Sequence, residues 1–94
     1  MAEYFVRVEL FSAKGDDYSD LHDGMAALGL NRTVRFDDGH EYRLPTGSYF
    51  GSSQLNSAQL RDRVRAVANP QSPHRNASVF VCQSSDWSAW LYVD

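Results

Sequence analysis

Residues 4–11 read Tyr-Phe-Val-Arg-Val-Glu-Leu-Phe, and this stretch decides the fold. Its β-branched and aromatic residues recur with a period of two, which is typical of a β-strand. Alternate side chains point to opposite faces of a strand, so one face is apolar and suits a core, while the other is mixed and open. The apolar face carries Tyr4, Val6, Val8 and Leu10.

The segment after this strand predicts a helix over residues 17–28. Its apolar residues are spaced by three, four and three positions, which places them along one side of an α-helix. They are Tyr18, Leu21, Met25 and Leu28. Asp16 and Asp17 are expected to cap the start of the helix, and Gly29 to end it, because glycine readily adopts a positive φ.

A hairpin is predicted next. Residues 32–36 and 41–44 alternate like strands, and Asp37-Asp38-Gly39 between them is typical of a hairpin turn. Pro45 and Gly47 interrupt the second strand, which is expected to resume only briefly through residues 49–50.

The last part of the chain predicts a second helix and another strand. Ser57 is expected to cap a helix with apolar positions at Leu60, Val64 and Val67, and the helix ends near Pro70. Residues 77–82 alternate as a strand. Residues 86–94 form an aromatic tail, which we expect to add an edge strand or to contact a second copy of the chain.

This order of elements indicates an α+β fold. The succession β-α-β-β-α-β is that of a ferredoxin-like two-layer sandwich, with both helices on one face of a four-stranded antiparallel sheet. The tail would supply an extra C-terminal strand. The chain has 94 residues, which suffice for one such domain over residues 1–94.

Composition and charge narrow the function classes. Hydrophobic residues make up 43% of the chain, which argues against intrinsic disorder, and a net charge of −3 argues against a surface that binds nucleic acid all over. The charge is uneven: residues 1–41 carry nine acidic and four basic side chains, and residues 42–94 carry three and five. Eight of the nine basic residues are arginines, so a local phosphate or carboxylate site stays open.

Cys82 is the only cysteine, which excludes an intrachain disulfide and a cysteine-rich metal site. His, Asp and Glu residues do not occur at the spacings of known metal motifs, so we expect neither a metal nor another cofactor. The N-terminus lacks the pattern of a signal peptide, and no stretch approaches a membrane span. We therefore expect a cytoplasmic protein without membrane contact.

The open face of the predicted sheet favours RNA as a partner. Alternation places arginine and phenylalanine side chains there, and these suit the phosphates and bases of single-stranded RNA. The expected RNA-binding residues are Phe5, Arg7, Arg32 and Phe80. The alternative is that the phenylalanines of this face are buried in a homodimer interface.

Cleavage of RNA would need a proton carrier and a cation. His22 is the candidate proton carrier, and Arg35 and Arg43 are the candidate cations for the charge that develops on the reacting phosphate. His40, in the acidic turn, could serve in place of His22. The structural alternative is that His22 packs its ring at the border of the helix and that His40 is solvated.

Three segments carry a resemblance to a known family. They are residues 4–10, the helix from Asp17 to Met25 with Gly29-Leu30-Asn31-Arg32-Thr33-Val34, and residues 38–49 with Tyr42-Arg-Leu-Pro-Thr46. Over most of residues 3–70 the chain resembles the GhoS family of small antitoxins from type V toxin-antitoxin systems. The resemblance implies a ferredoxin-like fold similar to that of the CRISPR-adaptation protein Cas2, and an antitoxin endoribonuclease that cuts toxin mRNA. It carries no catalytic residue over to this chain.

A second function class stays open beside the endoribonuclease. The acidic N-terminal half could mimic nucleic acid, as in a phage- or plasmid-borne inhibitor of the anti-CRISPR kind that occupies a nuclease or defence complex without catalysis. An acidic docking surface favours this protein-binding inhibitor. An arginine-rich sheet face favours the endoribonuclease.

Overall fold

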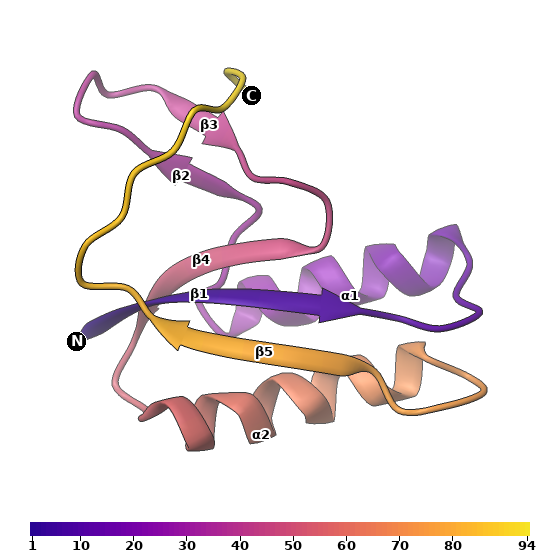
Figure 1. Cartoon of the computed structure of the whole chain (residues 1–94). Coiled ribbons are helices and arrows are strands. Elements are labelled where there is room, and N and C mark those ends of the chain that lie inside the picture. Colours follow the sequence, from indigo (N-terminus) through magenta and orange to yellow (C-terminus); the bar gives the residue numbers. More distant parts are fainter.

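The computed structural model describes residues 1–94 and consists of strands and helices that pack in two layers, with a hairpin and a tail beside them (Figure 1). In chain order the elements are β1 (Ala2–Glu9), α1 (Gly15–Ala27), β2 (Thr33–Arg35), β3 (Glu41–Arg43), β4 (Ser48–Ser53), α2 (Ser57–Ala68), the short 3₁₀ helix η1 (Asn69–Gln71) and β5 (Ser78–Gln83).

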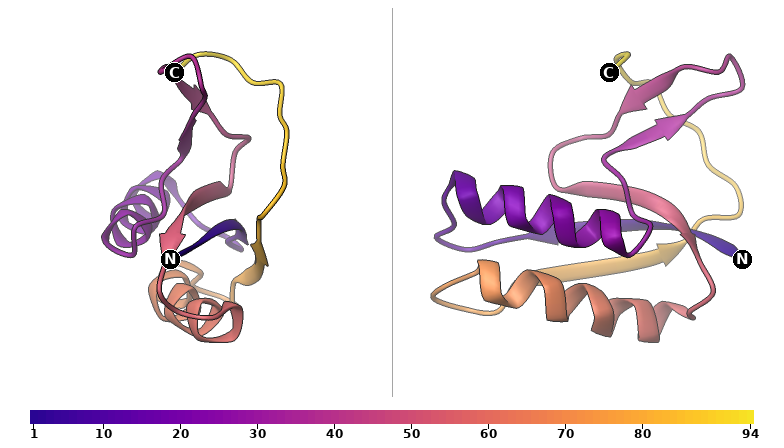
Figure 2. Two further views of the ribbon diagram at one scale, coloured as in Figure 1. Left: turned by 90° about the vertical axis from the view of Figure 1, so that its left-hand side faces the viewer. Right: turned by 180° about the vertical axis from the view of Figure 1, so that it is seen from behind.

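β1 is the central strand of a three-stranded antiparallel sheet with the order β4-β1-β5. Phe5 lies opposite Phe50 of β4 and Cys82 of β5. Because β4 and β5 both run antiparallel to β1, they are parallel to each other, and α2 connects them across β1. Both helices cover the same face of the sheet (Figure 2, left). The chain is therefore an α+β protein whose arrangement is compatible with a ferredoxin-like fold.

The core lies between this sheet and the two helices. The even-numbered side chains of the first strand, from Tyr4 to Leu10, are at most 5% exposed, which confirms the apolar face predicted from alternation. The helices meet them with side chains that are at most 1% exposed: Leu21, Met25, Leu60 and Val64. The opposite face of the sheet is left to the odd-numbered residues of β1.

Strands β2 and β3 do not join this sheet, so the prediction of a single four-stranded sheet built with residues 32–36 and 41–44 is wrong. They form a separate hairpin around the predicted turn, where Gly39 has a φ of 84°. β4, expected only as a brief continuation, takes the place beside β1. The segment after α1 pairs with the sheet only at Asn31, which exchanges two backbone hydrogen bonds of 2.8 and 2.9 Å with Phe50.

The hairpin, which stands apart from the sheet, has the tail as its partner. Residues 84–94 cross from the end of β5 to the hairpin (Figure 1). There the backbone N–H of Arg43 donates to the carbonyl of Tyr92 over 2.9 Å. Val34 of β2 is 6% exposed and lines a cavity with Trp87 and Leu91 of the tail. The tail therefore extends the hairpin and not the main sheet.

The end of α1 sets the position of the residues that follow it. Gly29 has a φ of 83° and donates to the carbonyl of Ala26 over 2.9 Å. Leu30 donates to the carbonyl of Met25 over 3.0 Å, which completes a Schellman motif. The predicted stop at Gly29 is confirmed, and it turns Asn31 and Arg32 back toward β4.

The two helix starts differ from the predicted ones. α1 begins earlier, because the N–H of Lys14 donates to the carboxylate of Asp17 over 2.9 Å and Gly15 is already helical. α2 is capped by Asn56 and not by Ser57. Asn56 and Gln59 bond reciprocally over 2.8 and 3.0 Å, a capping box that holds the first turn.

Candidate functional site

A cavity of about 530 Å³ lies where α1, the hairpin and the end of the tail meet. We call it the polar pocket, and its walls include His22 and Tyr18 of α1, Arg32 just before β2, Arg43 of β3, and Asp94 at the end of the tail. Its volume is within the range of ligand sites in proteins. Three of the residues singled out in the sequence, His22, Arg32 and Arg43, are thus brought to one place from three separate segments.

Hydrogen bonds fix the protonation of His22. Its Nε2 lies 3.0 Å from a terminal nitrogen of Arg32, and its Nδ1 lies 2.7 Å from the hydroxyl oxygen of Tyr49. A guanidinium has no acceptor, so Nε2 must be the unprotonated nitrogen that accepts from Arg32. Nδ1 therefore carries the ring proton and donates a hydrogen bond to the hydroxyl oxygen of Tyr49. The ring is neutral, and its Nε2 lone pair accepts from Arg32, which also lines the polar pocket.

The surroundings also favour neutral His22. Partial burial lowers the pKa of His22 from its ordinary 6.5, the positive charge of Arg32 lowers it further, and Asp23 raises it in partial compensation. Burial, the main cause, raises the pKa of Tyr49 to about 12, so its phenol stays protonated at neutral pH. His22 is therefore unprotonated at Nε2 near neutrality, and it can accept a proton there when Arg32 moves away.

Arg43 is held loosely at the rim of the polar pocket. Its Nε donates to the carboxylate of Asp94 over 3.4 Å, and the two side chains are 68% and 51% exposed. An ion pair this long and this exposed contributes little to the stability of the fold, because water and salt screen the attraction between its charges. The guanidinium can leave Asp94 for a more strongly charged anion such as a phosphate.

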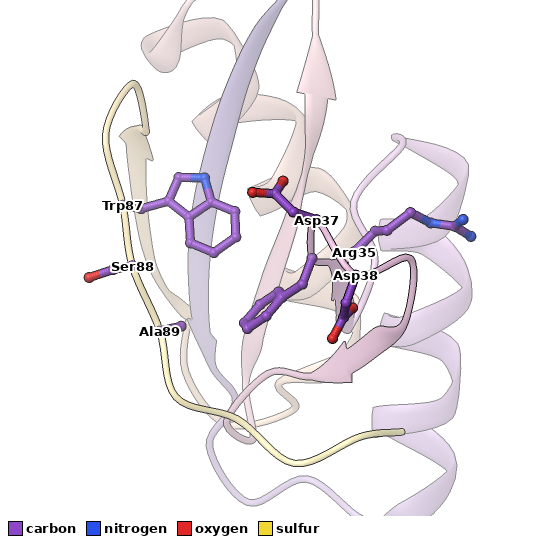
Figure 3. A pocket seen from close by; sticks show the side chains of 7 residues that line it. Arg35, Asp37, Asp38, Trp87, Ser88 and Ala89 are labelled. Carbon is purple, nitrogen blue, oxygen red and sulfur yellow. The ribbon is translucent and has the colours of Figure 1, made fainter.

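Arg35 lies outside the polar pocket. Its Nε donates to Glu41 over 2.9 Å, and it borders a different cavity of about 450 Å³ formed by the hairpin turn and the tail. Figure 3 shows Asp37, Asp38 and Trp87 around this cavity and the Arg35 side chain extending away from Trp87. The structure therefore separates Arg35 from His22 and Arg43, with which it was grouped in the sequence.

Arg7 supports the wall of the polar pocket from the open face of the sheet. It donates to the carbonyl of Thr46 over 3.0 Å and lies against Gly47, where a side chain would collide with its guanidinium. Gly47 has a φ of 83°, a conformation that glycine adopts easily. Both Thr46 and Gly47 line the polar pocket, so Arg7 holds the loop that shapes it.

Phe5 and Phe80 line a third cavity, of about 410 Å³, between the open face of the sheet and the tail. We call it the aromatic chamber, and its walls also include Phe50, Trp87, Leu44 and Pro45. The tail arches over this side of the sheet (Figure 2, left). Leu44 and Pro45 line the polar pocket as well, so the two cavities share a wall.

Sequence reasoning missed several residues of these cavities. Tyr49 was read only as part of a brief strand, although its place next to Phe50 in an alternating segment could have assigned it to the helix side. Asp94 and Trp87 reach the cavities through the path of the tail, which no local pattern predicts. His40 is exposed in the hairpin turn, where its backbone N–H donates to Asp38 over 2.9 Å.

Comparisons with known proteins give no match: no family profile fits the chain, and no curated protein is similar to it in sequence. None of the helices has both the length and the apolar character needed to span a membrane.

Proposed function

We propose that this protein is an endoribonuclease that binds single-stranded RNA and cleaves it at the polar pocket, the activity implied by the resemblance to GhoS antitoxins. The observation that carries the proposal is the convergence of neutral His22 with the guanidinium groups of Arg32 and Arg43 around one cavity. Metal-free RNA cleavage needs such a base beside such cations.

Phosphate binding would prepare His22 for this role. Arg32 and Arg43 are both exposed, and each can form paired hydrogen bonds with phosphate oxygens. Arg32 now shields the lone pair of Nε2 over 3.0 Å. When a phosphate draws Arg32 away, this lone pair becomes free for the 2′-hydroxyl of the same nucleotide. Substrate binding and activation of the base are thereby linked.

The reaction itself is an internal transfer. Nε2 of His22 takes the proton of the 2′-hydroxyl, the 2′-oxygen forms a bond to phosphorus, and the bond from phosphorus to the 5′-oxygen breaks. The leaving 5′-oxygen takes a proton from water, and His22 returns its own to solvent. The products are a 2′,3′-cyclic phosphate and a 5′-hydroxyl, while Arg32 and Arg43 stabilise the charge on the phosphate.

The sheet geometry supports assignment of the fold as ferredoxin-like. β4 and β5 are parallel strands separated by β1, which is one split β-α-β unit around α2. Asn31 pairs antiparallel with Phe50 of β4 and so continues parallel to β1, which gives a second split unit around α1. In this assignment the fourth strand is reduced to Asn31. A cytoplasmic location and a toxin mRNA as target belong to the same proposal.

The test is a time course with end-labelled single-stranded RNA, including the transcript of a neighbouring toxin gene where one exists, in EDTA and in magnesium. We expect cleavage in both, because the polar pocket supplies base and cations from its own side chains. His22→Ala should slow cleavage by about 10² to 10⁴. Arg43→Ala should slow it by about 10² to 10³, by analogy with the loss of one oxyanion donor.

Two arginine variants serve as comparisons. Arg61 of α2 is exposed and paired with Asp62 over 3.0 Å, so Arg61→Ala removes a similar ion-paired charge away from the polar pocket and should leave the rate unchanged. Arg35→Ala decides between the sequence prediction and the geometry. A loss as large as that of Arg43→Ala would place the reaction elsewhere, and full activity of His22→Ala would refute the assignment of the base.

One observation favours the second candidate, a protein-binding inhibitor. α1 carries Asp16, Asp20 and Asp23 on its exposed surface, where together they form an acidic strip. Such a strip could occupy the nucleic-acid groove of a nuclease. If the wild-type protein cuts no RNA, and replacement of these aspartates by asparagine abolishes inhibition of a nuclease complex, this second function replaces the first.

A further inference from the structure

We propose that the aromatic chamber is a subsite for one unpaired RNA base, which belongs to a nucleotide next to the phosphate in the polar pocket. The inference rests on the proposed function and extends it to substrate selection. It gives the open face of the sheet and the tail one shared role, the binding of a base. Catalysis at the polar pocket does not by itself use either of them.

The composition of the chamber suits a nucleobase. Its volume of about 410 Å³ exceeds the volume of a base, and the rings of Phe5, Phe50, Phe80 and Trp87 line it. Single-stranded RNA is recognised in this way, by bases that leave their own stack and lie on aromatic side chains. A flat aromatic ligand with a polar edge therefore fits this cavity better than an aliphatic one.

Phe80 is the ring most available for stacking. It is 65% exposed, although it lies in the middle of β5 opposite Arg7. None of the aromatic pairs in the protein includes it, whereas Trp87 is already in contact with Phe36 and Phe50, at ring-centre distances of 6.0 and 5.3 Å. Trp87 is thus a fixed side wall, and Phe80 is an unpaired platform.

The chamber also lies at the right place for a nucleotide chain. Leu44 and Pro45 separate it from the polar pocket and contribute to both cavities. Because the two cavities share this wall, a nucleotide whose phosphate is held by Arg43 has the chamber as its neighbouring cavity.

Two properties of the substrate follow. A base in a duplex cannot enter the chamber without losing its pairing partner, so cleavage is confined to unpaired RNA. Among the lining side chains, Cys82, Ser84, Ser88 and the indole N–H of Trp87 offer the few polar atoms, and stacking on the rings accepts any base. Selection is therefore by single-strandedness, with weak preference for base identity.

The test combines base removal with ring removal. A short single-stranded RNA that the wild type cleaves is made uncleavable by a 2′-O-methyl group at the cut, and an abasic residue is placed at each position in turn. Binding is measured for the wild type, Phe80→Ala, and Trp90→Ala as the matched control, since Trp90 is 77% exposed and lies outside the chamber. Circular dichroism checks folding, and Phe80→Leu replaces Phe80→Ala if the latter unfolds.

For the wild type and Trp90→Ala we expect one position where the abasic residue weakens binding, by roughly 5-fold to 150-fold. In Phe80→Ala the same abasic residue should have no further effect, because the stacking partner is already absent. If each abasic position weakens binding equally in the wild type and in Phe80→Ala, while Arg43→Ala still slows cleavage by about 10² to 10³, the base subsite is refuted and the endoribonuclease stands. If the wild type neither binds nor cuts any RNA, both proposals fail.

Discussion

Gly51 of β4 is the position where one added methyl group would most disturb the site. A Cβ at Gly51 would overlap the carbonyl oxygen of Gly29 and lie 3.2 Å from the Cα of Leu30. Both neighbours are backbone, so no side chain can rotate to make room. Gly51→Ala must therefore push apart β4 and the segment after α1, and this segment carries Arg32 into the polar pocket.

The loss of stability in Gly51→Ala can be worked out from the contacts that the substitution breaks. Overpacking typically destabilises by about 1–3 kcal/mol, and the two hydrogen bonds between Asn31 and Phe50 contribute about 0.5–1.5 kcal/mol each. The free energy of unfolding should therefore fall by about 2–6 kcal/mol. This is a large part of the 5–15 kcal/mol typical of a small domain.

Urea denaturation followed by circular dichroism measures this loss, and RNA cleavage at low temperature measures the displacement of Arg32. Gly15→Ala is the matched control, because a Cβ added at this position would meet no atom within 4 Å and the φ of Gly15 is not positive. It should leave stability unchanged or raise it by about 0.4–1 kcal/mol. If the free energy of unfolding of Gly51→Ala lies within about 0.5 kcal/mol of the wild-type value, Gly29 and Gly51 do not lie close together in solution.

Four further outcomes are expected. The rate of RNA cleavage should rise with pH through the pKa of His22, which lies below 6.5, and then level off; a rate that falls over that range would show that His22 acts protonated. Because this pKa is lower in the folded protein, stability should also decrease as the pH drops below 6.5, and His22→Ala should remove that part of the decrease in a melting series. Tyr49→Phe leaves the Nδ1–H of His22 without its acceptor, so we expect a loss of about 1–3 kcal/mol in urea denaturation and slower cleavage, whereas an unchanged rate would mean that the ring orientation is set elsewhere. Sedimentation should show a homodimer, and deletion of residues 86–94 should lower solubility by exposing the edge of β3; a monomer at micromolar concentration with and without the tail would contradict the dimer.

The elements with strong local patterns could be predicted from the sequence. The alternation of residues 4–11, the apolar stripes of the two helices and the turn at Gly39 depend on neighbours in the chain, and all four are present. The first residue of a helix does not follow from the apolar pattern, because the cap at Asn56 depends on which side chain reaches Gln59.

The assignment of strands to sheets could not be predicted, since it depends on partners far away in sequence. Residues 33–35 and 41–43 have a pattern that fits either the main sheet or a separate hairpin, and the course of the tail decides between them. The same holds for the site: His22 and Arg32 follow from residue type, but Tyr49 and Asp94 join them only through the fold.

The central place of β1 has a consequence for how the chain folds. β1 is the first strand to leave the ribosome, yet its partners are residues 48–53 and 78–83. Closure of such long loops is entropically costly, and domains dominated by distant pairings fold slowly. At a synthesis rate of about 5–20 residues per second, β1 has both edges unpaired for a few seconds until β4 emerges, and its second edge stays unpaired longer, until β5 emerges. The charged side chains at the odd-numbered positions of β1, one arginine and two glutamates, then keep the nascent strand from pairing with other chains.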